Sequence, residues 1–262
     1  LLEDPSIKKI GQNIKFDFIV FYKCGIMLSS MEDTMLMSYV LDAGKNRHNM
    51  DTLSEIHLGH KTISFKDMVG TGKKEINFSE VELDKAKDYA AEDADVTFRL
   101  YKKFIKNLKS EKMINIYEIF EKPLIKILAF MEIEGVEIDS KFLKSLSSKF
   151  EKKIQKLEKE VFKISKKEFN IASPKQLGEI IYNDLKIAGL KKTKKGSFAT
   201  SASVLEDLAF KGHEFPKLIL DWRQVSKLKN TYSDALPEHL NPNTKRVHTS
   251  FLLAATTTGR LA

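Results

Sequence analysis

Hydrophobic positions recur every three or four residues along much of the chain, a spacing that places them on one face of a helix. Between Ile14 and Cys24, for example, apolar side chains stand at positions 14, 18, 21 and 22, and Gly25 supplies a C-terminal stop. This pattern predicts helices over residues 14–24, 34–41, 49–58 and 81–108. Shorter extended stretches predict strands over residues 7–10 and 26–31. Helices that alternate with a few short strands indicate an α/β domain whose strands are partly missing.

Capping signals mark two of these helix starts. Asp33 is positioned to open the helix over 34–41. Ser79 and Glu82 have the spacing of a capping box, which predicts that the long helix begins at Val81.

The second half contains a long helix with one narrow apolar stripe. Its apolar residues follow each other at steps of three and four, as in a coiled coil: Leu143, Leu146, Phe150, Ile154, Leu157, Val161 and Ile164. Because the other faces are charged, the helix over 142–166 is expected to pair with a single antiparallel neighbour, for which residues 222–232 are the candidate. Between them we expect a compact helical tip, in which Ser173 and Pro174 begin one helix.

Length and composition support two folded domains. The chain has 262 residues, of which 42% are hydrophobic, so disordered and collagen-like structure is excluded. A polar patch at 109–112 predicts an α/β domain over 1–112 and a mainly α-helical domain over 113–262. The single cysteine, Cys24, excludes a disulfide scaffold and an all-cysteine zinc site.

The sequence shows no membrane or export signal. No apolar run approaches the roughly 18 residues that a membrane span needs. No charged region and cleavage site precede the domain, so a signal peptide is not expected. A start at Leu1 without Met and an abrupt stop at Ala262 lead us to expect a piece of a longer protein.

The basic excess of the chain lies entirely in its second half. Residues 1–120 carry 18 Lys and Arg against 19 Asp and Glu, whereas residues 121–262 carry 26 against 17. A local balance of +9 favours a polyanionic partner, most simply nucleic acid. The alternative is a lysine-rich codon usage that places lysine on any solvated surface.

Three residues form a candidate metal and catalytic site. Tyr89 and Asp93 are four residues apart, so on a helix they share one face. A phenol beside a carboxylate can orient a metal-bound water, and Asp17 can supply a second carboxylate from another element. Carboxylates from separate helices suit Mg²⁺, and two such ions can cleave a phosphodiester. The alternative is that both aspartates are solvated or cap helices.

Two basic regions are candidates for phosphate contacts. One combines a lysine-rich loop with hydroxyls at helix starts: Lys192, Lys194, Lys195, Thr200 and Ser201. The other is the helix over 222–232, where Arg223 and Lys227 face one way while Val225 and Leu228 face another. An exposed lysine loop without function explains the first region equally well. Trp222 is expected in packing, and His248 is expected to be structural or to form a hydrogen bond.

Several motifs together resemble those of family A DNA polymerases, the bacterial DNA polymerase I group. The stretches GQNIKFD, DTMLMSYVL, HKTISF and YAAEDADVT resemble the 3′–5′ exonuclease domain of that family. FEKPLIKILAFMEIEGVEID resembles its entry into the polymerase portion. The thumb of that family resembles a further set of stretches: FNIASPKQLGEIIY, KTKKGSFATSASVLEDLA, WRQVSKLKNTY, RVHTSF and TTTGRLA. The resemblance implies a partial ribonuclease H-like exonuclease domain followed by a mainly α-helical thumb with a long antiparallel helix pair.

The resemblance also implies residue roles. Asp17 and Asp93 match carboxylates that bind Mg²⁺, Tyr89 matches the tyrosine that positions the attacking water, and Asn13 matches a contact with the single-stranded 3′ end. In the thumb, the residues that match contacts along the primer–template duplex are Arg223, Lys227 and Lys229, and Arg260 matches an arginine that reaches the minor groove.

Two parts of the family pattern are absent from the sequence. An Asp-x-Glu strand should precede Leu1, and the palm carboxylates and the fingers that bind deoxynucleoside triphosphates should follow Ala262. We therefore expect a fragment that lacks turnover by itself, from a monomeric, cytoplasmic, nucleoid-associated enzyme that extends primers and proofreads 3′ ends. The alternatives are a non-catalytic DNA-binding module and a stand-alone 3′–5′ exonuclease with a helical accessory domain.

Overall fold

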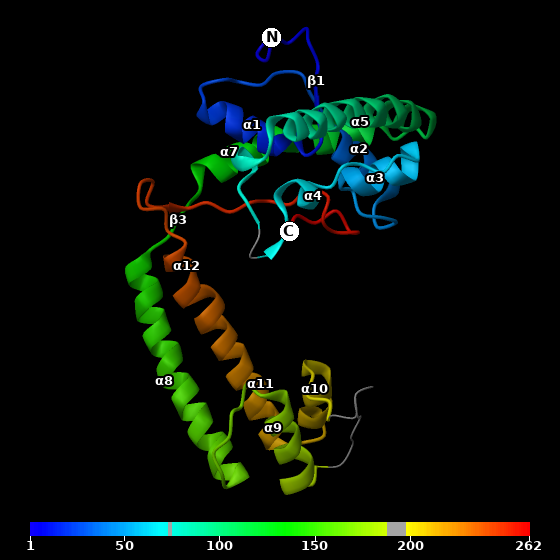
Figure 1. Ribbon diagram of the computed structural model, residues 1–262. Coiled ribbons are helices and arrows are strands. Elements are labelled where there is room, and N and C mark those ends of the chain that lie inside the picture. Colours follow the sequence, from blue (N-terminus) through cyan, green and yellow to red (C-terminus); the bar gives the residue numbers. More distant parts are fainter. Residues whose placement is uncertain (73–74, 188–197) are drawn as a thin grey trace. The chain divides into compact units, whose positions relative to one another are not determined.

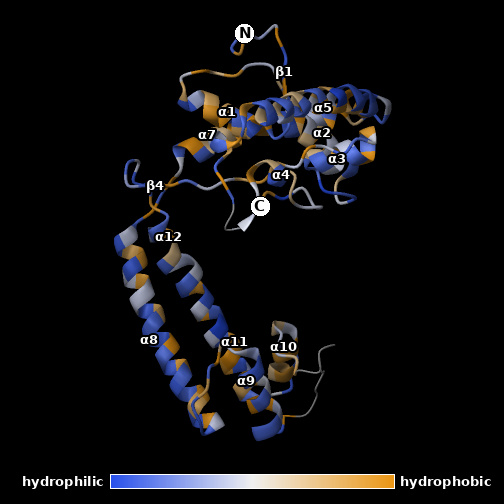
Figure 2. Ribbon diagram, in the orientation of Figure 1, coloured by the Kyte–Doolittle hydropathy of each residue, from blue (hydrophilic) through white to orange (hydrophobic). Residues whose placement is uncertain are grey.

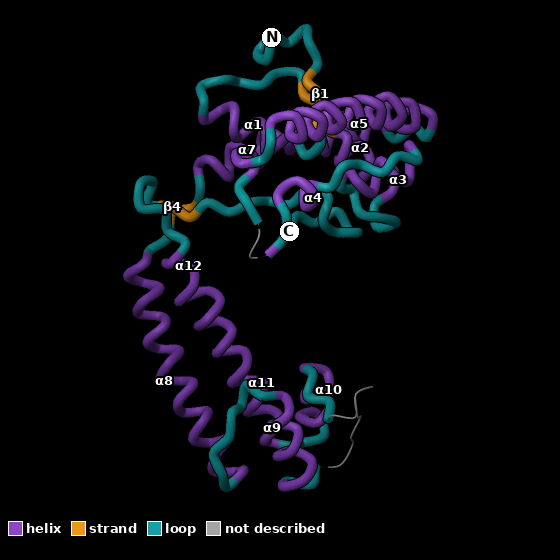
Figure 3. The backbone as a smooth tube through the Cα atoms, in the orientation of Figure 1, coloured by secondary structure: helices purple, strands orange, loops and turns teal. Residues whose placement is uncertain are grey.

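The computed structural model describes residues 1–72, 75–187 and 198–262 and divides the chain into two compact units (Figure 1). The first unit consists of Leu1–Gly135 together with His248–Ala262, and the second unit consists of Val136–Val247. Helices make up most of each unit, and the strands are short (Figure 3).

The first unit contains a two-stranded parallel sheet with helices around it. β1 (Lys9–Gly11) pairs with β2 (Met31–Asp33). The predicted strand over 26–31 was wrong for all but its last residue, because the positive φ of Ser30 interrupts the extended backbone and pairing begins at Met31. The helical elements are α1 (Ile14–Lys23), α2 (Thr34–Asp42), α3 (Met50–Leu58), α4 (Phe65–Val69), η2 (Phe78–Glu80), α5 (Leu83–Ser110), α6 (Ile114–Ile116), η3 (Tyr117–Glu121) and α7 (Lys122–Glu134).

The long helix α5 begins without the predicted capping box. Asn77 forms a box with Glu80 instead: the N–H of Ser79 donates to Asn77 Oδ1 at 3.1 Å, and the N–H of Asn77 donates to Glu80 Oε2 at 2.9 Å. The prediction from Ser79 and Glu82 was wrong because Asn77 takes the capping role two residues earlier, on the short 3-10 turn η2. Glu82 precedes α5 and makes no side-chain cap hydrogen bond.

The core of the first unit gathers around the C-terminal half of α5. Leu100, Phe104 and Leu108 are fully buried there, together with side chains of α1, α2 and α7. Leu253, from the returning segment 248–262, joins the same core. Since α7 packs against α1, this compact unit extends to Gly135, beyond the predicted domain boundary at residue 112.

The second unit is built on two long helices and a helical tip. α8 (Ser140–Ser165) packs along α11 (Glu214–Lys227) and the π-helical segment η5 (Leu228–Asp234) (Figure 1). Trp222 bonds to Glu158, whereas Lys229 pairs with Glu151, so the two helices run antiparallel. The remaining elements are β3 (Val136–Glu137), which pairs with β4 (Arg246–Val247), and α9 (Pro174–Glu179), η4 (Ile180–Asp184), α10 (Ala202–Phe210) and α12 (Ala235–Glu238).

Burial along α8 increases toward the tip. Leu143 and Leu146 are half-buried, whereas Ile154, Leu157 and Val161 are buried against α11 and the tip. Apolar and hydrophilic residues alternate along the helix (Figure 2). The tip has its own core, which includes Leu177, Ile181, Leu205, Phe215 and Ile219. Among the described residues, no helix combines the length and the apolar character required to cross a membrane.

Candidate functional site

Asp33 fixes the turn that begins α1. Its buried carboxylate, at the end of β2, accepts the N–H of Asn13 and of Ile14, each at 3.0 Å. It also accepts the N–H of Met35 at 2.9 Å and of Leu36 at 3.4 Å, so one side chain caps α1 and α2 together. Burial raises the pKa of Asp33 to about 6, although the four N–H groups favour the ionised form. Asn13 is left exposed at the start of α1, in a left-handed conformation with φ of 59°.

Tyr89 and Asp93 lie on α5, at the spacing of one helical turn. Burial raises the pKa of Tyr89 to about 12, and the negative charge of Asp93 adds to the effect. Burial also raises the pKa of Asp93, and the charges of Glu92 and Asp51 raise it further, against an opposing hydrogen bond with Tyr89. Within the described residues, Oδ1 of Asp93 is buried without a hydrogen-bond partner. A buried carboxylate oxygen without a donor is a suitable ligand for a hard cation such as Mg²⁺.

Asp17 is half-buried on α1, and burial raises its pKa. Across residues 1–72, 75–187 and 198–262, no group of three His, Cys, Asp or Glu side chains is arranged to hold a metal ion. The two predicted metal ligands are therefore present on separate helices, but they do not make a complete site by themselves.

An aromatic cluster adjoins Tyr89. Phe65 of α4 stacks on Phe78 of η2 with ring centroids 5.8 Å apart, and Tyr89 lies about equally far from both rings, at 6.1 and 6.0 Å. Phe65 remains 48% exposed and Phe78 37%. Exposed aromatic rings can stack on unpaired bases. The sequence analysis missed both phenylalanines, and the available signal was two isolated aromatic residues in an otherwise polar stretch.

Glu92 anchors the loop that precedes Phe65. Its carboxylate bonds to His60 Nε2 at 2.7 Å and accepts the N–H of Ile63 at 2.6 Å. The hydroxyl of Ser54 holds the carbonyl of His60 from the other side, at 2.8 Å. Glu92 thus fixes the aromatic cluster relative to the helix that carries Asp93, another role that sequence analysis did not identify.

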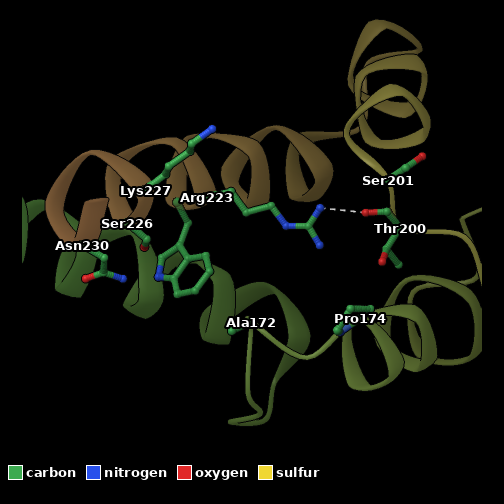
Figure 4. Close-up of a pocket in the computed structure, with 9 residues that line it drawn as sticks. Ala172, Pro174, Thr200, Ser201, Arg223, Ser226, Lys227 and Asn230 are labelled. Carbon is green, nitrogen blue, oxygen red and sulfur yellow. Dashed lines mark hydrogen bonds between the residues drawn. The ribbon is translucent and has the colours of Figure 1, made fainter. Parts of the chain in front are cut away.

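A second candidate site is a pocket of about 610 Å³ in the second unit (Figure 4). Arg223 reaches across it, and its Nη1 donates to the carbonyl of Thr200 at 2.7 Å. Burial lowers the pKa of this half-buried guanidinium. The pocket is lined by Ala172, Pro174, Thr200, Ser201, Trp222, Arg223, Ser226, Lys227 and Asn230.

The structure brings four of the predicted DNA-binding residues to this pocket: Thr200, Ser201, Arg223 and Lys227. Lys229 does not line it. The ammonium of Lys229 pairs with Asp234 at 2.7 Å and with Glu151 at 3.4 Å, and the hydrogen bond with Asp234 raises its pKa. Arg260 is exposed in the returning segment of the first unit. The predicted contacts Lys192, Lys194 and Lys195 lie outside the described residues.

Trp222 and His248 make structural contacts. Trp222 packs between the helices of the second unit, and its Nε1 donates to Glu158 at 3.1 Å. The Nδ1 atom of His248 lies 2.8 Å from the carbonyl of Glu132. Both residues therefore have the structural contacts that the sequence suggested.

Comparison with protein families accounts for both halves of the chain. Residues 1–109 match the family model described as 3′–5′ exonuclease, and residues 140–262 match the model described as DNA polymerase family A. The chain belongs to DNA polymerase family A. The resemblance found in the sequence motifs is thereby confirmed.

Curated relatives of this family A chain include enzymes named DNA polymerase I from several bacteria. The protein from Rhizobium leguminosarum is 50% identical over the whole chain, which covers 26% of that protein. The protein from Pseudomonas aeruginosa is 42% identical, again over the whole chain and 29% of its own length. The chain therefore spans little more than a quarter of the length of these relatives.

A solved structure has the same fold. The POL domain of Pol1 from M. smegmatis, in a complex with DNA primer-template and dNTP, superposes with a TM-score of 0.81 at 25% sequence identity. The match covers all of this family A chain and 42% of the other.

Proposed function

We propose that this chain is a stretch of a DNA polymerase I that includes part of the 3′–5′ exonuclease domain, residues 1–112, and the thumb with the start of the palm, residues 113–262. The observation that carries the proposal is the 50% identity to a DNA polymerase I along the entire chain. The whole protein extends a primer on a template with deoxynucleoside triphosphates and removes mispaired 3′ ends. We assign the rest of the palm and the fingers to the part of such an enzyme that this chain does not span. We assign the whole enzyme to the bacterial cytoplasm, associated with the nucleoid, as a monomer.

In the exonuclease part, which we assign to the ribonuclease H-like fold, Asp17 and Asp93 hold Mg²⁺. The unpartnered Oδ1 of Asp93 supports this role. Mg²⁺, when bound, lowers the pKa of a water and polarises the phosphodiester. The raised pKa of Tyr89 keeps its hydroxyl protonated at neutral pH, so that it can donate a hydrogen bond to the attacking water. The exposed Asn13 and the rings of Phe65 and Phe78 bind the single-stranded 3′ end.

In the thumb, the pocket binds the backbone of the primer–template duplex. Arg223 and Lys227 supply positive charge, and the hydroxyl of Ser201 and the Thr200 region lie beside them. Lys229 is already paired with two carboxylates, so these two residues supply the charged contacts of the pocket. Such contacts recognise backbone and not sequence, so the grip is equally strong on any duplex. Arg260 is assigned to the minor groove near the primer terminus.

The thumb assignment is tested by the double variant Arg223→Gln, Lys227→Gln. Each lost phosphate contact lowers the slope of log Kd against log salt by about 0.9, so we expect a loss of roughly two units with random-sequence duplexes. The matched control neutralises two exposed lysines of the same unit outside the pocket, Lys211→Gln and Lys217→Gln, and is expected to leave the slope unchanged. Equal slopes for both double variants would overturn the assignment.

A further inference from the structure

One face of α8 carries a row of lysines that takes no part in the pocket. The row consists of Lys141, Lys149, Lys152, Lys156, Lys159 and Lys163, which are six of the eight lysines of this helix. At 100° per residue these six positions fall within an arc of about 80°. Their steps are eight, three, four, three and four residues, so the row follows the same helical period as the apolar stripe. We call this set the outer lysine row.

The outer lysine row lies opposite the packed face of the helix. All six side chains are exposed, whereas Ile154, Leu157 and Val161 are buried against the rest of the unit. The acidic residues are placed elsewhere: Glu158 accepts a bond from the indole of α11, and Glu151 pairs with a lysine of η5. Two of the three acids of α8 are therefore turned toward its partner, whereas the third, Glu160, flanks the row beside Lys156.

Little within the described residues neutralises the row. Among its six members, only Lys156 has an ion pair there, a long one of 3.9 Å to Glu160. Lysines at spacings of three and four repel each other and destabilise a helix. A polyanion that lies along the row removes this repulsion.

A lysine-rich composition alone does not account for the row. The helix α5 is of similar length and also rich in lysine, but acids accompany only its first half, and Lys102, Lys103, Lys106 and Lys109 lie in a second half without acids. Lys85 pairs with Glu82, Lys87 with Asp84, and Arg99 with Asp95. The six lysines of α5 are spread over an arc of about 160°, twice that of the outer lysine row, so lysine enrichment on this helix does not produce a comparably narrow row.

We propose that the outer lysine row binds a second stretch of DNA backbone, apart from the duplex held by the pocket. The inference rests on the proposed function and extends it. The row is about 33 Å long, which matches roughly one helical turn of a DNA duplex. None of its members offers the planar fork that reads base edges, so the contact is independent of sequence.

An anionic membrane is the less favoured partner. Helices that lie on membranes insert an apolar face beside their basic one. On α8 the apolar stripe is already buried in the second unit toward the tip, and Phe142 at the start of the helix is its one large apolar side chain that is exposed, too little for an inserted apolar face.

The test compares two fourfold variants of the full chain. The row variant replaces Lys149, Lys152, Lys156 and Lys159 by glutamine. The control variant makes the same change in charge on α5, at Lys85, Lys87, Lys106 and Lys109, which are also exposed. Circular dichroism checks that both retain their helix content, as expected because glutamine is a good helix former.

Binding is measured with a primer–template of about 12 base pairs and with one of about 40, across a salt series. For the longer DNA we expect the row variant to bind about tenfold more weakly and to lose two to four units of salt slope. For the shorter DNA we expect a change below about twofold, and for the control variant no change with either DNA. If the native chain binds a second equivalent of the short duplex and the row variant does not, the second stretch can come from a separate DNA molecule. If no second equivalent binds, the second stretch is the flank of the same DNA molecule that the pocket holds.

Three results would overturn the inference. The row variant could match the control variant on the longer DNA, or it could weaken both DNAs equally. It could also lose binding to vesicles with about 30% anionic lipid while its DNA affinity stays unchanged. None of these results touches the proposed thumb function, which is tested separately by the Arg223 and Lys227 variants on the shorter DNA.

Discussion

Asp33 shows how much of the first unit depends on one carboxylate. Its four N–H donors come from the starts of two helices, and α1 carries the predicted ligand Asp17. Its backbone N–H in turn donates to the hydroxyl of the fully buried Tyr117, at 2.9 Å. Since Ile14 and Leu36 are buried, their N–H groups depend on Asp33 for a hydrogen bond.

The titration of Asp33 gives the first prediction, tested with Asp33→Asn. The pKa rises from an ordinary 3.8 to about 6 on folding, so the folded protein holds the proton more tightly than the unfolded chain. The stability from this group is therefore fully present below about pH 4 and is lost as pH rises through 6. We expect the free energy of unfolding of the native protein, minus that of the variant, to fall by about 2–3 kcal/mol between pH 4 and pH 7.

Urea unfolding followed by circular dichroism measures this difference at each pH. The variant serves as the control, because every other titrating group is common to both proteins. A difference that grows as pH rises would show that the four N–H groups outweigh burial and lower the pKa of Asp33.

At the scale of residues, local contacts were predictable and distant ones were not. That Asp33 opens α2 follows from the neighbouring sequence, and Asp139 caps α8 in the same way, accepting the N–H of Phe142 at 2.8 Å. The bonds from Asp33 to Asn13 and Ile14 span about twenty residues and exist only because β1 pairs with β2. The position of Glu92 on its loop likewise depends on tertiary packing.

At the scale of elements, α8 shows that a periodic stripe predicts a helix well and its burial less well. The predicted helix over 142–166 and the observed Ser140–Ser165 agree closely, and α8 packs along α11 and η5. All seven stripe positions look alike in the sequence. In the structure, however, burial requires material on the other side, which the tip supplies only for the later positions.

This gradient in burial predicts that two similar truncations lower the free energy of unfolding by unequal amounts. Leu157 is 8% exposed and packs in the core, so Leu157→Ala should lower the free energy of unfolding by about 3 kcal/mol. Leu146 is half-buried, and Leu146→Ala should cost about 1 kcal/mol or less. Chemical denaturation of the two variants makes the comparison, with each variant as the control for the other. Equal losses would mean that the stripe is buried evenly along α8.

At the scale of the whole molecule, the chain crosses from the first unit to the second and returns. The returning segment, residues 248–262, is held by a buried ion pair between Lys15 of α1 and Glu132 of α7. The ammonium of Lys15 donates to the carbonyl of Phe251 at 2.6 Å, and the N–H of Phe251 donates to Glu132 at 2.7 Å. This link joins positions 236 residues apart, so no local pattern predicts it, and it is one reason why the compact units differ from the domains expected from the sequence.

The metal site of the exonuclease part is incomplete in the described residues. Asp17 and Asp93 bring two carboxylates, but the described residues contain no third ligand arranged with them. Hydrolysis with two metal ions needs both ions held in fixed positions. We therefore expect the purified chain, supplied with Mg²⁺, to leave a 5′-labelled single-stranded DNA undigested.

Two controls distinguish activity of this chain from a trace of contaminating nuclease: EDTA and the double variant Asp17→Ala, Asp93→Ala. Digestion that the double variant retains comes from a contaminant and not from this chain. Rapid Mg²⁺-dependent digestion that the double variant abolishes would contradict the prediction, because it would require a complete metal site within these 262 residues. That outcome would favour a stand-alone exonuclease over a stretch of a larger polymerase, since the same two aspartates would then suffice without any further part of the enzyme.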